Sequence, residues 1–112
     1  MNKETEAYAA RVQTGAQAVA AHYGLKSQIS ITQEECAELI QALSKLRRVG
    51  CGDVYSVGYI EARNHVAEEM ADVQNLLIQL AFLLNNEEMV RFWLEQKIDE
   101  TLSEIEEEHN EP

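Results

Sequence analysis

The chain has 112 residues, of which 46% are hydrophobic and 6% aromatic, with one Pro and five Gly. This composition favours a single helical domain over residues 1–112 and argues against a turn-rich sandwich or barrel. Nine Lys and Arg stand against 20 Asp and Glu, which gives a formal charge of −11. Because that charge repels nucleic acid and anionic membranes, we expect neither as a partner.

Neither the first residues nor the longest apolar run has the features of a targeting or membrane segment. Residues 1–13 are mixed and charged and lack the hydrophobic region of a signal peptide. Residues 76–84 are apolar, but Gln79 interrupts them and the run is too short to span a bilayer. We therefore expect a soluble, cytoplasmic protein.

Hydrophobic periodicity predicts two helices in the first half of the chain. The first covers about residues 5–23 and is ended by Gly24, with a core stripe of Tyr8, Val12, Ala16, Val19 and Tyr23. Ser27 or Ser30 is expected to cap the second helix, which extends to about residue 48. The expected core positions of this second helix are Ile40, Leu43 and Leu46.

The second half predicts two more helices after a glycine-rich connection over residues 49–58. The third helix begins near Tyr59 and carries the clearest apolar stripe, formed by Val66, Met70, Val73, Leu77, Leu80 and Leu84. Its second half is apolar on most sides, so we expect oligomerisation to bury it. The fourth helix starts after residues 85–88 and has apolar positions at Val90, Leu94, Ile98, Leu102 and Ile105. An acidic tail from about residue 106 is expected to fray.

Several other residues receive a structural interpretation. Cys36 is expected to be a buried thiol, and no role is assigned to Cys51 in the connection. The aromatic side chains of Phe92 and Trp93 could stack on a base, but at helical spacing they are expected in the core. No spacing suggests catalysis for the histidines, which are His22, His65 and His109.

Two acidic clusters crowd like charges on one side of a helix. In the second helix, Glu35 and Glu38 are three residues apart, and Glu34 and Glu38 are four apart. In the third helix, Glu69 and Asp72 repeat the three-residue spacing. Such pairs each destabilise an isolated helix by about 0.2 to 0.5 kcal/mol. If the clusters face each other, a cation is needed to neutralise them, and ligands that are all oxygen select Mg²⁺, Mn²⁺ or Ca²⁺.

A solvated acidic face is the alternative interpretation of either cluster alone, because such surfaces are common in an acidic chain. The residues four positions before and after Glu35 and Glu69 are not cations at neutral pH. Local salt bridges therefore do not explain the crowding, and the presence of two clusters on consecutive helices favours a metal site.

The segments EECAE (residues 34–38) and EMAD (residues 69–72) resemble the EExxE and ExxD motifs of the MazG-like all-α nucleoside triphosphate pyrophosphohydrolases. The similarity extends over about residues 20–105. The resemblance implies an all-α, four-helix bundle completed by oligomerisation as a homodimer or homotetramer. It also implies Mg²⁺ as cofactor, with Mn²⁺ as a substitute, and hydrolysis of an NTP or dNTP to the monophosphate and pyrophosphate. We expect nucleotide-pool house-cleaning as the role, and within the superfamily it competes with dUTP or dCTP hydrolysis and with a histidine-pathway role. The preferred base stays open.

The resemblance implies roles for residues at the matching positions. The Mg²⁺ ligands would be Glu35, Glu38, Glu69 and Asp72. Glu34 would orient or deprotonate the attacking water. Lys45 and Arg48 are candidates for phosphate contacts, although Arg48 is equally well explained as a cation that stabilises a helix C-terminus. Asn75 could contact ribose or base, or could make a buried interhelical hydrogen bond.

Two other functions compete with this one. A ferritin-like di-iron bundle requires two ExxH motifs, and only Glu106 and His109 have that spacing. A non-enzymatic helical oligomerisation or adaptor module fits the apolar third helix and the negative surface. It leaves the four acids unexplained, and it predicts that changing them to Gln stabilises the protein or has no effect, with or without Mg²⁺.

Overall fold

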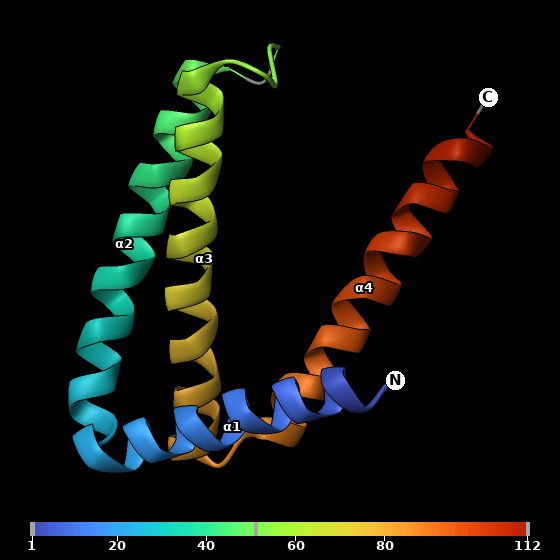
Figure 1. Cartoon of the computed structure of the whole chain (residues 1–112). Helices are drawn as coiled ribbons and strands as arrows, with labels where there is room; N and C mark the ends of the chain where they lie inside the picture. Colours follow the sequence, from blue (N-terminus) through green and yellow to red (C-terminus); the bar gives the residue numbers. More distant parts are fainter. Residues whose placement is uncertain (1, 51, 112) are drawn as a thin grey trace.

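The computed structural model describes residues 2–50 and 52–111, so Cys51 lies outside the described residues. It contains four helices, α1 (Lys3–Tyr23), α2 (Leu25–Val49), α3 (Val57–Leu84) and α4 (Glu87–Asn110), and no strand in the described part. The expected all-α fold is confirmed. The helices α2 and α3 lie antiparallel and side by side, α1 crosses one end of this pair, and α4 extends away from it (Figure 1).

The boundary between α1 and α2 differs from the expectation. At the start of α1, Asn2 caps the helix by accepting a hydrogen bond from the backbone N–H of Thr5 at 2.8 Å. Gly24 ends α1 as expected, but α2 begins at the next residue instead of after Ser27 or Ser30. Gly24 has φ +85°, a conformation that glycine adopts without steric cost, so one residue redirects the chain. The expected side-chain caps are therefore wrong.

The ends of α3 and α4 follow local capping chemistry. Ser56 accepts a hydrogen bond from the backbone N–H of Tyr59 at 3.2 Å and starts α3 two residues before the expected position. Asn85, in the left-handed conformation with φ 52°, ends α3 where the break was expected. The last helix continues to Asn110, so the acidic residues from 106 onward belong to α4 in this structure.

Small and polar side chains, not the expected apolar stripes, fill the interfaces between α1, α2 and α3. The buried apolar residues are Ala16, Ala20, Ala42, Ala62, Val66 and Leu76. In α2, the expected core residues Ile40 and Leu43 are 64% and 47% exposed. In α3, Val66 of the expected stripe is buried and Val73 and Leu80 are half-buried, but the other members are exposed. The face with buried side chains also carries Glu69 and Gln79.

The apolar residues that were expected in a core lie mostly on the surface of this chain. Exposed members of the α3 stripe are Met70, Leu77 and Leu84. No residue of α4 is buried, and its exposed apolar residues include Val90, Phe92, Trp93, Leu94, Ile98, Leu102 and Ile105. Cys36 is half-buried and has a free thiol. Within the described residues, no helix is both long and apolar enough to cross a bilayer.

Candidate metal centre

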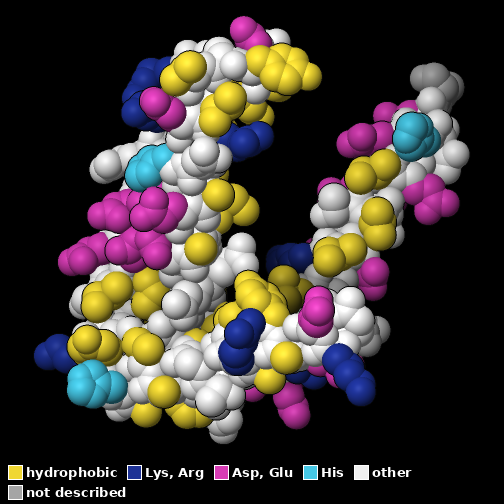
Figure 2. All heavy atoms as spheres, viewed as in Figure 1, with side chains coloured by type: hydrophobic (Ala, Val, Ile, Leu, Met, Phe, Trp, Pro, Cys, Tyr) yellow, Lys and Arg dark blue, Asp and Glu magenta, His cyan; other side chains and the backbone are white. Residues whose placement is uncertain are grey.

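Carboxylates from α2 and α3 converge at the middle of the antiparallel pair. One carboxylate oxygen from each of Glu35, Glu69 and Asp72 lies within 4.8 Å of the other two. Acidic side chains gather on this face of α2 and α3 (Figure 2). Because Glu35 comes from one helix and the other two residues from the next, the packing of the pair sets the distance between the clusters.

Two of these carboxylates are partly withdrawn from water without a compensating donor. Glu69 is only 7% exposed, and its Oε2 has no hydrogen-bond partner among the described residues. The Oε2 atom of the half-buried Glu35 is also buried and without a partner. A buried carboxylate oxygen is costly unless a donor or a cation meets it. Three converging oxygen donors, two of them with an unpartnered atom, therefore fit a hard divalent cation such as Mg²⁺.

The electrostatics of Glu35 reflect this crowding. Desolvation raises the pKa of Glu35 from 4.5 to about 7, and the neighbouring Glu38 contributes to the increase. The negative charges of Asp72 and Glu69 raise the pKa further. In the absence of a cation, Glu35 therefore holds a proton over a pH range in which an ordinary carboxyl group is ionised.

This raised pKa predicts how the metal-free protein responds to pH. Between about pH 4.5 and 7, folded Glu35 keeps a proton that the unfolded chain releases, so its contribution to stability is full below pH 4.5 and is lost as the pH rises to about 7. In EDTA, the melting temperature of the wild type is expected to fall across this window more than that of Glu35→Gln, as measured by circular dichroism. Glu61→Gln, which removes an exposed acid from α3, should keep the wild-type slope. If the melting temperature fell equally with pH in all three proteins, the raised pKa of Glu35 would be contradicted.

The other two acids of the first motif occupy different positions. Glu38 is close enough to Glu35 to raise the pKa of that carboxyl group, and it therefore borders the group of three. Glu34 is exposed and does not belong to that group. The structure thus brings Glu35, Glu69 and Asp72 together directly, with Glu38 as a neighbour and Glu34 on the outer side.

A hollow of about 460 Å³ adjoins the acidic cluster on the side of the α2–α3 connection. It is lined by Glu38, Gln41, Ala42, Lys45, Arg48, His65 and Glu69. Lys45 and Arg48 therefore share one surface with two of the acids, as expected for groups that contact a phosphate chain bound beside a metal. The Nε2 atom of His65 lies 3.9 Å from Glu69 Oε1.

His65 was missed by the sequence reasoning, which found no partner for any histidine. The available signal was its position four residues before Glu69, a spacing that places both side chains on one face of a helix.

Gln79 is buried and makes an interhelical hydrogen bond with Gln28. Asn75 accepts a hydrogen bond from Gln79.

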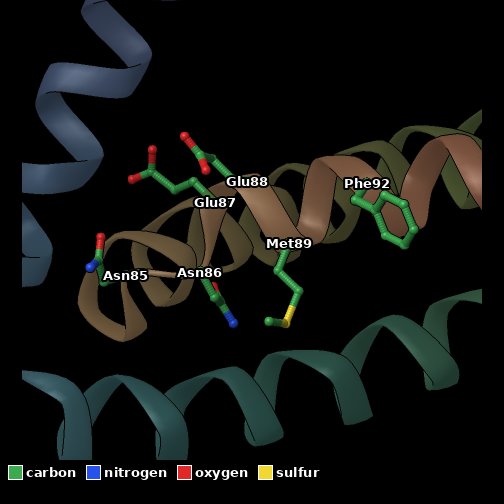
Figure 3. A pocket seen from close by; sticks show the side chains of 6 residues that line it. All are labelled: Asn85, Asn86, Glu87, Glu88, Met89 and Phe92. Atoms are coloured by element: carbon green, nitrogen blue, oxygen red, sulfur yellow. The ribbon is translucent and has the colours of Figure 1, made fainter.

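A larger hollow lies elsewhere and lacks the chemistry of a phosphate site. It measures about 710 Å³ at the α3–α4 turn, and its lining residues are Asn85, Asn86, Glu87, Glu88, Met89 and Phe92. The side chains of Glu87 and Glu88 point to one side of the turn and that of Met89 to the other (Figure 3). With two acids, no basic group and diverging side chains, this hollow is not a candidate for binding a nucleotide.

The fold and the site together define an all-α protein with a carboxylate cluster suited to a divalent cation. The chain belongs to the MazG family, because the model of the MazG nucleotide pyrophosphohydrolase domain matches residues 24–111. The matched range contains α2, α3 and α4 and both acidic clusters. No curated protein and no solved structure gives a significant match to the chain.

Proposed function

We propose that this protein is a Mg²⁺-dependent nucleoside triphosphate pyrophosphohydrolase, which converts an NTP or dNTP to the monophosphate and pyrophosphate. The observation that supports this most strongly is the convergence of Glu35, Glu69 and Asp72 beside a hollow lined by Lys45 and Arg48. Membership of the MazG family supports the same reaction class. A role in clearing unwanted nucleotides from the cytoplasmic pool would fit this activity.

The proposed ligands of Mg²⁺ are Glu35, Glu38, Glu69 and Asp72. Their donor atoms are all oxygen, which suits Mg²⁺ and allows Mn²⁺ as a substitute. When bound, Mg²⁺ would supply positive charge to the phosphate oxygens and lower the pKa of a coordinated water. It would also offset the repulsion between a triphosphate and a chain with a formal charge of −11.

The side chains around the cluster have separate tasks in the proposed reaction. Glu34, which is exposed and precedes Glu35 in the chain, accepts the proton of a water molecule that attacks the α-phosphorus. The bond between the α- and β-phosphates breaks, and pyrophosphate leaves with the bonding electrons. Lys45 and Arg48 stabilise the charge on that leaving group from the adjoining hollow. Asn75 is the proposed contact to the nucleoside.

The proposal is tested with a panel of NTPs and dNTPs incubated with the wild type and Mg²⁺, with products separated by chromatography. We expect equal amounts of nucleoside monophosphate and pyrophosphate, with a rank order among bases that identifies the substrate. Nucleoside diphosphate with inorganic phosphate would contradict the proposed bond cleavage. Lack of hydrolysis of every nucleotide would contradict the enzymatic function itself.

We further propose that the chain works as a single domain within a homodimer or homotetramer. The apolar residues Leu94, Ile98 and Leu102 follow one face of α4 and are each about 60% exposed. Among the described helices, α4 contacts α3 alone, and a row of such residues along so open a helix is unusual for the surface of a monomer. Association through this face would bury it.

If the chain associates through the apolar face of α4, a charge placed on that face should dissociate the assembly. Ile98→Glu is expected to dissociate the assembly, because burying an unpaired carboxylate in an apolar interface is costly. Gln96→Glu adds the same charge on the opposite face of the helix and should leave the assembly intact. Sedimentation velocity measures the size of the assembly for both variants. A wild type that sediments as a monomer at micromolar concentration would contradict the assembly.

A further inference from the structure

A chain of carboxamides joins α2 to α3 beside the acidic cluster. The Nε2 atom of Gln28 donates to Oε1 of Gln79 at 2.6 Å, and the Nε2 atom of Gln79 donates to Oδ1 of Asn75 at 3.0 Å. Gln28 and Gln79 are only 2% and 3% exposed, whereas Asn75 is exposed. Thr32, also buried, donates its hydroxyl to the backbone oxygen of Gln28 at 2.6 Å. The chain of amides thus begins in the core and ends at the surface.

The position of this chain follows from the antiparallel register of α2 and α3. Gln28 lies seven residues before Glu35, and Gln79 lies seven residues after Asp72. Seven residues are two turns of a helix, so the amide contact and the acidic contact lie on the same stripe of both helices. Asn75 stands between them, one turn after Asp72. The exposed end of the amide chain therefore borders the candidate metal centre.

The direction of the hydrogen bonds determines what Asn75 presents at the surface. Its oxygen is occupied by Gln79, which leaves its amino group, with two N–H donors, free of the chain. In the opposite direction, the amino group of Gln28 would occupy the buried position of its Oε1, which has no partner among the described residues. Both N–H groups of Gln28 would then be buried without an acceptor, whereas in the observed direction one of them donates to Gln79. The observed direction makes the Asn75 oxygen the acceptor at the end of the chain.

The stripe has opposite chemistry on the two sides of the acids. On the side of the α2–α3 connection lies the hollow with Lys45 and Arg48, which suits phosphate. On the other side lies the neutral donor of Asn75, which suits a carbonyl or hydroxyl oxygen. We propose that a nucleotide binds along this stripe with its terminal phosphates at Lys45 and Arg48 and its nucleoside at Asn75, and that Gln28 and Gln79 are positioning residues that orient the Asn75 amino group. This inference rests on the proposed function and adds the orientation of the substrate.

The test compares two product fragments as inhibitors of the full-length protein with Mg²⁺. One is the monophosphate of the best nucleotide substrate, which carries the nucleoside, and the other is pyrophosphate, which does not. Asn75→Ala is expected to raise the inhibition constant of the monophosphate about three- to tenfold, the effect of one lost hydrogen bond, and to leave that of pyrophosphate unchanged. Arg48→Ala is expected to raise the inhibition constant of pyrophosphate and to leave that of the monophosphate unchanged.

The positioning role requires a variant that fills the same space. Gln79→Met keeps the side-chain volume but removes both amide hydrogen bonds, and it is expected to show the same selective loss as Asn75→Ala. Gln74→Ala, which truncates an exposed amide on another face of α3, should behave like the wild type. Circular dichroism confirms that each variant is folded.

The outcomes separate the inference from the function on which it rests. If the wild type hydrolyses nucleotides but Asn75→Ala affects both fragments equally or neither, the orientation is wrong and the function stands. If Asn75→Ala is selective but Gln79→Met behaves like the wild type, the positioning role is wrong. A wild type without hydrolysis of any nucleotide would overturn the proposed function and this inference together.

Discussion

Asp72→Asn and Glu69→Gln are each expected to lower kcat/KM for nucleotide hydrolysis by at least about 100-fold. Both substitutions keep the shape of the side chain but replace a charged oxygen donor of the converging group with a neutral amide. Loss of residues that merely support metal ligands costs about 10- to 100-fold in affinity or activity, and a direct ligand should cost no less. Steady-state release of pyrophosphate at saturating Mg²⁺ measures the effect.

The matched control for these variants is Glu61→Gln. Glu61 is an exposed acid on α3 outside the group of three, so its substitution removes the same charge from the same helix. We expect activity within about twofold of the wild type, because surface substitutions away from special features have small effects. If Glu61→Gln were as damaging as Asp72→Asn, net charge and not the proposed metal centre would explain the loss.

Mg²⁺ is expected to raise the melting temperature of the wild type by about 10 °C at pH 8. At a concentration of 100 times Kd, a ligand that binds only the folded chain stabilises it by about 2.7 kcal/mol, and 1 kcal/mol corresponds to about 4 °C in a domain of this size. The pH lies above the raised pKa of Glu35, which is about 7, so Glu35 is ionised and available to a cation. Differential scanning fluorimetry with Mg²⁺ and with EDTA measures the shift.

The same measurement separates the enzyme from an adaptor module. In a variant with Gln at Glu35, Glu38 and Glu69 and Asn at Asp72, the shift caused by Mg²⁺ should vanish, while stability in EDTA should rise because like-charge repulsion is removed. A wild type that does not respond to Mg²⁺ would favour the adaptor interpretation. In that case the cluster would be an acidic surface without a bound ion.

The acidic group could be predicted from the sequence because its signal is local. Glu69 and Asp72 are three residues apart on one helix, and carboxylates at that spacing share a face whatever the tertiary packing. The pairing of this helix with α2 was expected from the resemblance to the MazG-like family. The structure adds which oxygens converge, with Glu35 inside the group and Glu34 outside it.

The faces of the helices were predicted less well, because the sequence does not state which neighbour covers which stripe. Met70 and Leu77 form the most regular apolar pattern of α3, yet they are exposed in the single chain. The face that packs on α2 carries Glu69 and Gln79, and Gln79 is hydrogen-bonded to the facing Gln28. An apolar stripe predicts that a surface will be covered, but it does not distinguish another helix of the chain from a second copy.

The start of α2 is a second feature that the sequence did not predict correctly. Ser30 and Gln33 have the spacing of a capping box, but the φ of +85° at Gly24 allows α2 to begin directly after α1. The helix therefore includes Gln28, which lies two turns before Glu35 and makes the interhelical amide contact. A helix starting at Ser30 would have left this contact out of the prediction.

The most direct test of the central claim, that the α2–α3 acids form a metal centre for nucleotide hydrolysis, is pyrophosphate release from the best substrate at a series of Mg²⁺ concentrations. For the wild type we predict no release in EDTA and a rate that saturates with Mg²⁺. For Glu35→Gln we predict a rate at least about 100-fold lower at every Mg²⁺ concentration. Full activity of the wild type in EDTA, or of Glu35→Gln in Mg²⁺, would contradict the claim.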